Sequence, residues 1–160
     1  MSLVLGIDPG TASTGYGFVQ DRSDSGLEMI QFGVISTPAG IADHQRLALL
    51  YQNLNELLLL HKPDGCAVEK LFFQKNIKTA ISVGQARGVV LLAVYQAGLV
   101  LAEYTPNEIK KAVTGYGSAG KKQVQEMVRV LLGLPEIPRP DDASDALAVA
   151  ITHLHTWKSP

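Results

Sequence analysis

Two kinds of apolar pattern follow one another along the chain, and their order limits the folds that it can adopt. Strand-like stretches come first, at Leu3–Asp8, Gly15–Gln20 and Leu27–Thr37, and the polar segment 21–26 joins the second to the third. A short, turn-prone connection of this kind usually joins antiparallel neighbours. The N-terminal part of the chain therefore predicts an antiparallel meander.

Beyond the meander, helical and strand-like patterns alternate. Leucines recur at three- and four-residue steps from Asp43 to His61, as in an amphipathic helix, and Pro63-Asp64-Gly65 ends that pattern. The later predicted elements are a strand at Cys66–Lys70, a helix at Thr79–Ala97, a strand at Leu99–Tyr104 and helices at Pro106–Val113, Lys122–Leu132 and Asp141–Trp157. This order predicts an α/β fold, a mixed five-stranded sheet with helices on both faces.

Length and composition limit the class of protein. A chain of 160 residues is expected to form a single domain, 1–160, and a hydrophobic fraction of 46% is that of a folded protein. No apolar run reaches the roughly eighteen residues that a bilayer crossing needs, and the N-terminus lacks the basic flank of an export signal. We therefore expect no membrane contact and a cytoplasmic location. Cys66 lies in an apolar stretch, which predicts a buried, inert thiol.

Two acidic residues stand at the ends of predicted strands. Asp8 ends the first strand and Glu69 lies near the end of the fourth. The tips of strands in open α/β sheets are where ligands bind, so both carboxylates are candidates for one site.

Acidic residues also gather at the start of the last predicted helix. Asp142 and Asp145 are three residues apart, which places both side chains on one helix face. Asp141 and Asp142 have an alternative interpretation as helix caps, and we favour capping for Asp141. Apolar residues follow Asp145, where a carboxylate is costly unless a cation pairs with it. Spacing alone leaves a shared metal site and simple capping both open.

Taken in order, these segments resemble the RuvC family of Holliday-junction resolvases. The resemblance covers nearly the whole chain and rests on Leu5-Gly6-Ile7-Asp8-Pro9-Gly10, Ala67-Val68-Glu69, Gly84-Gln85-Ala86-Arg87-Gly88 and Asp142-Ala143-Ser144-Asp145-Ala146-Leu147-Ala148. It implies a ribonuclease H-like fold and an endonuclease that cuts two strands of like polarity in a four-way DNA junction, leaving 5′-phosphate and 3′-hydroxyl ends.

The same resemblance implies the cofactor and the partners. Two Mg²⁺ ions, which Mn²⁺ can replace, would be held by Asp8, Glu69, Asp142 and Asp145. In a two-metal scheme one ion activates a water and the other stabilises the leaving oxygen. The family also implies a homodimer and a branch-migration complex of RuvA and RuvB as partners.

Basic and aromatic residues are candidates for contacts with DNA. A cluster of lysines between Tyr104 and Leu134 is either a solvated helix face or a positive patch for nucleic acid. Phe72 and Phe73, which follow the fourth predicted strand, are either core residues or a stacking platform. Their basic neighbours favour stacking of one ring on an unpaired base. The resemblance places that ring at Phe72, and it places Lys110 and Lys121 near the scissile phosphate, with Lys121 stabilising its charge. The full set of candidate contacts is Phe72, Phe73, Lys75, Lys110, Lys121 and Lys122.

A net charge of −1 is unusual for a protein that grips phosphates. Setting aside the five carboxylates at 8, 69, 141, 142 and 145 leaves ten acidic residues against fourteen basic ones, so the rest of the surface carries +4. Metal ions would neutralise the five.

Other functions remain as alternatives. His153 and His155 lie about 12 Å or more beyond Asp145 along a helix, too far to share an ion with it, so we expect structural roles. The turn with Gly10, Thr11, Ser13 and Thr14 could bind a phosphate in an actin-like ATPase, but those folds need two domains. A nuclease of ribosomal RNA precursors and a non-catalytic junction-binding protein are further alternatives.

The long predicted helix Thr79–Ala97 is apolar on nearly every side, which suggests a second buried surface. Gly84 and Gly88 would let another backbone approach closely, so we expect dimer formation on this helix. A charged substitution at Val90 or Val94 is then expected to give folded monomers.

Overall fold

The predicted meander forms one side of a five-stranded sheet whose strand order is β3-β2-β1-β4-β5. In this computed structural model, which describes residues 1–70 and 77–157, β1 pairs antiparallel with β2 and parallel with β4. β2 also pairs antiparallel with β3, and β4 pairs parallel with β5. The strands are β1 (Leu3–Asp8), β2 (Ser13–Arg22), β3 (Gly26–Ser36), β4 (Gly65–Glu69) and β5 (Leu101–Tyr104). The mixed sheet expected from the sequence is confirmed.

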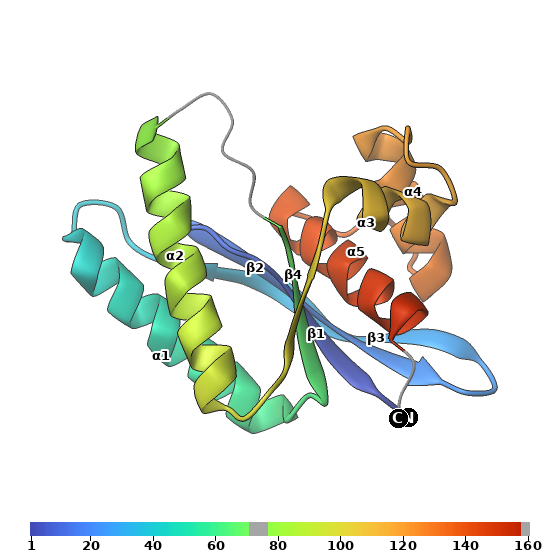
Figure 1. Cartoon of the computed structure of the whole chain (residues 1–160), viewed down its shortest axis with the longest axis horizontal. Helices are drawn as coiled ribbons and strands as arrows, with labels where there is room; N and C mark the ends of the chain where they lie inside the picture. Colours follow the sequence, from blue (N-terminus) through green and yellow to red (C-terminus); the bar gives the residue numbers. More distant parts are fainter. Residues whose placement is uncertain (71–76, 158–160) are drawn as a thin grey trace.

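Helices cover both faces of the sheet (Figure 1). On one face lie α1 (Asp43–His61) and α2 (Ile77–Gln96). The other face carries α3 (Pro106–Thr114), α4 (Lys121–Leu132) and α5 (Asp141–Thr156). Among the helices in these described ranges, none combines the length and apolar character needed to cross a membrane.

The central strand β1 separates two apolar cores. Leu5 and Ile7 are buried in the core beneath α1 and α2, whereas Val4 is buried in the core beneath α5. Side chains of successive strand residues point to opposite faces, so β1 supplies both cores. The chain therefore places the tip of β1 between two helical layers.

Glycines in β1 and β2 let α5 lie directly on the sheet. A Cβ atom on Gly6 would come within 2.0 Å of the backbone oxygen of Ala146, and one on Gly15 within 2.0 Å of the backbone oxygen of Asp142. Gly15 pairs with Asp8 across the two strands. The first turn of α5 is therefore pressed against the strand end that carries Asp8.

Strand ends differ from the sequence expectation where pairing decides them. β2 and β3 stay paired from Ser13 opposite Ser36 to Arg22 opposite Gly26, so part of the polar segment 21–26 continues the ladder. Cross-strand hydrogen bonds hold these polar residues in a strand that their own side chains do not favour.

The helix α2 corrects one expectation. Val90 and Val94 are buried in the chain's own core, against the sheet and α1, so they cannot form an outer dimer surface. The exposed apolar side chains of α2 are instead Ile77, Ile81, Leu92 and Tyr95. A helix that is apolar on nearly every side does not reveal from its sequence which face meets the sheet.

The thiol of Cys66 is buried as expected, and burial raises its pKa to about 12.

Candidate metal centre

Three carboxylates converge where β1 ends and α5 begins. Asp8, Asp142 and Asp145 each contribute one oxygen to a group whose atoms lie within 4.8 Å of one another. Asp8 is the last residue of β1, and the other two lie in the first turns of α5. Because Gly15 lets α5 contact the sheet, the helix brings its acidic face to the strand tip.

The charges in this group oppose one another. Burial, the charges of Asp145 and Asp142 and a hydrogen bond with Asp142 together raise the pKa of Asp8 to about 8. Burial also raises the pKa of Asp145, although Lys121 works in the opposite direction. Half-buried carboxylates that repel one another require a cation or a proton. An all-oxygen donor set of this kind fits Mg²⁺ or another hard divalent ion.

Glu69 lies beside this group at the end of β4. Among the described residues it is not one of the three whose oxygens lie within 4.8 Å of one another. Burial and the charge of Asp145 raise the pKa of Glu69, whereas Lys110 and Lys121 lower it. The structure thus brings three of the four predicted carboxylates together and places Glu69 within their electrostatic reach.

Lys121, the first residue of α4, reaches the acidic cluster. Its ammonium lies 3.1 Å from Oδ2 of Asp141 and 3.9 Å from Oδ2 of Asp145. Asp141 is not the helix cap that the sequence suggested, because Pro140 occupies that position without a side-chain cap. The Asp141 carboxylate instead accepts hydrogen bonds from Lys121 and, at 3.2 Å, from Nε2 of Gln125. The role of Asp141 follows from the packing of α4 against α5.

A groove of about 1160 Å³ adjoins the acidic cluster between α4 and α5. Lys122, another predicted DNA contact, lines the groove together with Arg139. Asp142 belongs to both the groove and the cluster. The groove therefore offers basic side chains next to the candidate metal ligands. The complete lining is Lys122, Gln125, Glu126, Ile137, Arg139, Pro140, Asp141 and Asp142.

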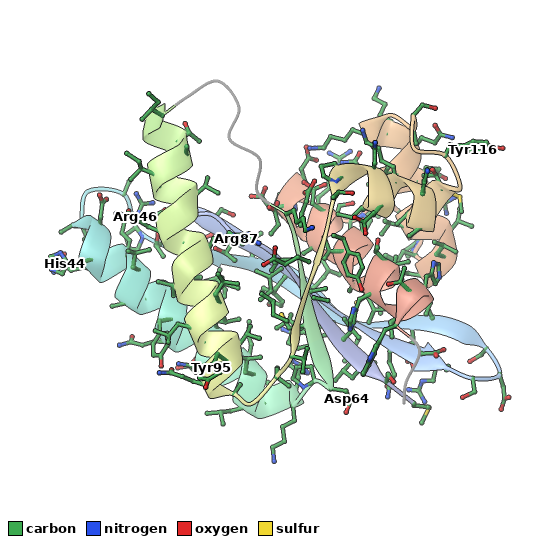
Figure 2. All side chains as sticks on the ribbon, in the orientation of Figure 1. His44, Arg46, Asp64, Arg87, Tyr95 and Tyr116 are labelled. Atoms are coloured by element: carbon green, nitrogen blue, oxygen red, sulfur yellow. The ribbon has the colours of Figure 1, made fainter. Side chains whose placement is uncertain are left out.

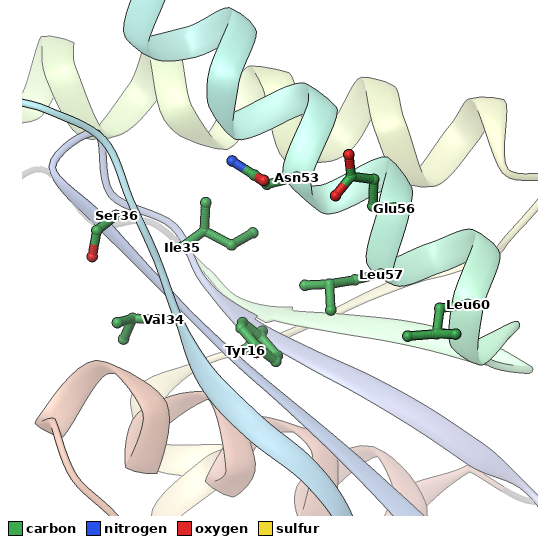
Figure 3. A pocket seen from close by; sticks show the side chains of 8 residues that line it. All are labelled: Tyr16, Val34, Ile35, Ser36, Asn53, Glu56, Leu57 and Leu60. Atoms are coloured by element: carbon green, nitrogen blue, oxygen red, sulfur yellow. The ribbon is translucent and has the colours of Figure 1, made fainter.

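A smaller cavity of about 370 Å³ lies between α1 and the β2–β3 side of the sheet (Figure 3). Its lining mixes apolar and polar side chains, and Glu56 is the charged residue in it. It opens on the α1 side of the sheet, whereas the acidic cluster lies against α5, so it has no part in the site.

The hydroxyls of the glycine-rich turn are bonded within the chain. Oγ1 of Thr14 donates to the backbone oxygen of Gly10, and Oγ1 of Thr11 donates to the backbone oxygen of Ser82 at 2.9 Å. These groups fix the turn after β1 and tie it to α2. The turn therefore serves the fold, which weakens the nucleotide-binding alternative.

The two histidines take structural roles. Nδ1 of His153 lies 2.7 Å from the hydroxyl of Tyr104, and its ring stacks on Trp157 with centroids 5.0 Å apart. Nδ1 of His155 lies 3.0 Å from the backbone oxygen of Ala112.

Three of the predicted DNA contacts, Phe72, Phe73 and Lys75, lie outside the described residues.

Sequence reasoning gave no role to Arg87, which the structure places beside Glu69. Nη1 of Arg87 donates to the backbone oxygen of Glu69 at 2.7 Å, and Nη2 lies 3.2 Å from Oε1 of Glu103. The segment Gly84-Gln85-Ala86-Arg87-Gly88 marked this part of the chain as a family motif, but the sequence did not indicate which strand Arg87 would contact.

Comparisons with known proteins agree on one family. The family model described as crossover junction endodeoxyribonuclease RuvC matches residues 4–153. The chain is 54% identical to the protein of that name from Syntrophomonas wolfei, over 97% of this chain and 90% of the relative. It is 55% identical to the one from Rubrobacter xylanophilus, over 94% of this chain and 84% of the relative.

Solved structures show the same likeness. Thermus thermophilus RuvC in complex with a Holliday junction substrate superposes with a TM-score of 0.91 at 36% identity, covering 97% of this chain and 94% of that one. The yeast mitochondrial Holliday junction resolvase Ydc2 shares the fold alone, with a TM-score of 0.70 at 14% identity over 95% of this chain and 77% of that one.

The sheet order and the acidic cluster at its edge define a nuclease of the ribonuclease H-like fold. Within that class, the chain belongs to the RuvC family of crossover junction endodeoxyribonucleases.

Proposed function

We propose that this chain is a structure-selective endonuclease that resolves four-way DNA junctions by paired nicks in two strands of like polarity, in recombination and DNA repair. The observation that carries the proposal is the convergence of Asp8, Asp142 and Asp145 at a strand tip in a member of the RuvC family. The products would carry 5′-phosphate and 3′-hydroxyl ends, which a ligase can join.

Four carboxylates would hold the metal. Asp8, Asp142 and Asp145 would bind divalent ions directly, and Glu69 would complete the set from the end of β4. We propose two Mg²⁺ ions per site, with Mn²⁺ as a substitute. When bound, such ions activate the attacking water and neutralise charge at the scissile phosphate. The chain's own carboxylates orient that chemistry, and the Lys121 ammonium stabilises charge on the phosphate oxygens.

Basic residues around the cluster would hold the DNA backbone. The charge of Lys110 lowers the pKa of Glu69, and we propose that its ammonium meets a phosphate of the bound strand. Lys122 and Arg139 line the adjoining groove, where the flanking strand would lie. Phe72, Phe73 and Lys75 stay in the proposal as contacts at the junction centre, by family resemblance.

We propose that the working unit is a homodimer built on α2. Ile81 and Leu92 are exposed on this helix, and apart from the helix's own nearby backbone no described atom lies within 4 Å of a Cβ placed on Gly84 or Gly88. The glycines therefore do not serve packing within the described part of one chain, and they would allow a second backbone to approach. Two identical sites related by a twofold axis can cut two strands at matching positions. A complex of RuvA and RuvB would deliver the junction.

A cleavage assay tests the proposal. Synthetic four-way junctions, linear DNA duplex and structured RNA would each be incubated with the protein, with and without Mg²⁺. We expect symmetric nicks in the junction that require Mg²⁺ and ligate after cleavage. Cleavage of the RNA in preference to the junction would favour the ribosomal RNA nuclease, and junction binding without cleavage would favour the non-catalytic alternative.

A further inference from the structure

Arg87 joins three elements through one side chain. It belongs to α2 and lies on the side of that helix toward the sheet (Figure 2). Its guanidinium contacts the last residue of β4 and a residue of β5. Nη1 donates to the backbone oxygen of Glu69 at 2.7 Å, and Nη2 lies 3.2 Å from Oε1 of Glu103. The two partners are reached by different nitrogens of one rigid, planar group.

The side chain of Arg87 is largely enclosed, with 12% of it exposed. A guanidinium taken out of water must recover its solvation from fixed partners. Here the partners are a carboxylate on one side and a backbone carbonyl on the other, and both belong to the paired ends of β4 and β5. The position of Arg87 is therefore determined on two sides.

Glu69 is the residue that benefits from this arrangement. It is the last residue of β4. The amide of the next residue, Lys70, still donates to the backbone oxygen of Tyr104 at 2.8 Å, and the regular pairing with β5 ends there. Strand ends fray unless other groups hold them. Arg87 holds this end through the carbonyl, and its ionic partner is Glu103, so the carboxylate of Glu69 stays available to the metal centre.

We infer that Arg87 is a positioning residue: it fixes the backbone of Glu69, and thereby the place of that carboxylate in the metal centre. The inference rests on the proposed function, since it takes Glu69 to be a metal ligand. Arg87 acts through geometry, and its charge serves to anchor it to Glu103. Groups that orient metal ligands without touching the metal typically affect metal affinity about 10–100-fold when removed.

The substitution Arg87→Lys separates geometry from charge. Lysine keeps the positive charge, but its one nitrogen on a flexible stem lacks the rigid planar geometry with which two guanidinium nitrogens hold the two partners. Arg22→Lys is the matched control, because Arg22 pairs with Glu28 in the exposed part of the β2–β3 hairpin. Each full-length variant would be titrated calorimetrically with Ca²⁺ and Mg²⁺ in the absence of DNA, and junction nicking would be measured as a function of Mg²⁺ concentration.

We expect Arg87→Lys to weaken divalent-ion binding by about tenfold or more. The Mg²⁺ concentration for half-maximal nicking should rise in parallel, and saturating Mg²⁺ should restore most of the nicking rate. Arg22→Lys should match the unmodified protein in both measurements. A folded Arg87→Lys protein with unchanged ion affinity would overturn the inference.

A second variant keeps the test decisive if Arg87→Lys does not fold. Glu103→Gln removes the anchor of the guanidinium at a half-exposed position and leaves Arg87 itself in place. We expect a smaller loss of ion affinity in the same direction, and no loss would overturn the inference. The proposed function is judged separately: an unmodified protein that binds Mg²⁺ but leaves junctions uncut refutes it, even where Arg87→Lys weakens ion binding.

Discussion

The ammonium of Lys121 lies 3.1 Å from Oδ2 of Asp141, one residue before a predicted metal ligand. The hydrogen bond to Asp141 and the charge of Asp145 raise the pKa of Lys121, so this side chain is charged at neutral pH. A fixed cation at the edge of the acidic cluster suits a phosphate that gains negative charge during cleavage. The pair is exposed, so it contributes little to folding and its value lies in placing the lysine.

Lys121→Ala should slow cleavage without weakening junction binding much. Loss of one preorganised charge-stabilising group typically reduces the rate by about 10²–10³-fold. Single-turnover cleavage of pre-bound junction, started with Mg²⁺, measures this step directly. Lys62→Ala is the control, because Lys62 follows α1 near the opposite end of the sheet, where Asp64 bonds to Leu3. An unchanged single-turnover rate in Lys121→Ala would remove Lys121 from the mechanism.

Replacing a carboxylate ligand should separate binding from cleavage. Asp145→Asn and Glu69→Gln keep the size of the side chain but remove the negative charge that holds a divalent ion, so we expect no detectable nicking and near-normal junction binding. Ca²⁺ should support binding but little cleavage, because its looser coordination positions the attacking water poorly. Gel-shift and nicking assays on the same samples provide both readouts. Full activity in either variant, or equal rates with Ca²⁺ and Mg²⁺, contradicts the assignment.

The raised pKa of Asp8 makes the metal-free protein sensitive to pH. In the folded chain this carboxyl holds its proton up to about pH 8, whereas in the unfolded chain it loses it near its ordinary value. The folded state therefore binds more protons between about pH 4 and pH 8, and its stability falls as the pH rises through that range.

Asp8→Asn should remove the part of this dependence that Asp8 contributes, while Asp145 and Glu69, whose pKa values are also raised, keep their parts. Without metal at pH 8, we expect the variant to be more stable than the unmodified protein by a few kcal/mol, and the difference should vanish near pH 4. Mg²⁺ should raise the Tm of the unmodified protein increasingly toward pH 8, because the ion displaces protons. Thermal melts in EDTA and in Mg²⁺ check this, with Asp24→Asn in the exposed β2–β3 turn as the control. Equal melting curves for Asp8→Asn and the unmodified protein at pH 8 would refute the prediction.

Two substitutions on α2 distinguish its outer and inner faces. Ile81→Glu changes a side chain that is 60% exposed, so the fold should survive while the proposed homodimer dissociates. Val90→Asp buries a charge in the core and should destabilise the chain by about 3–5 kcal/mol. Sedimentation and thermal melts measure the two effects. A dimeric Ile81→Glu protein would show that α2 is not the dimer surface.

The glycines of α2 offer an independent check of the same surface. Gly88→Ala should stabilise the helix by about 1 kcal/mol, because alanine is the better helix former and a Cβ here meets no described atom. It should nonetheless weaken the dimer if a second backbone approaches at this point. A more stable protein with unchanged dimer affinity would contradict the close approach.

The types of the elements and their order could be predicted from the sequence alone. Apolar periodicity depends on neighbouring residues only, so β1 and α1 were predicted with the bounds they have, Leu3–Asp8 and Asp43–His61. The acidic residues Asp8 and Glu69 could be predicted as site candidates because each stands at the end of a strand. The ends of parallel strands such as β1 and β4 lie at one edge of the sheet.

The covered side of each element, and the residues that contact one another across the fold, depend on how the elements pack. Val90 and Ile81 belong to one apolar helix, and the packing of the sheet and α1 against α2 buries the first while leaving the second exposed. The role of Gly15 follows from the backbone of Asp142, which lies over it. The role of Arg87 follows from its hydrogen bond to the backbone oxygen of Glu69. Such contacts join residues that are far apart in the chain. Local patterns cannot predict them, because packing depends on the shape and charge of both surfaces together.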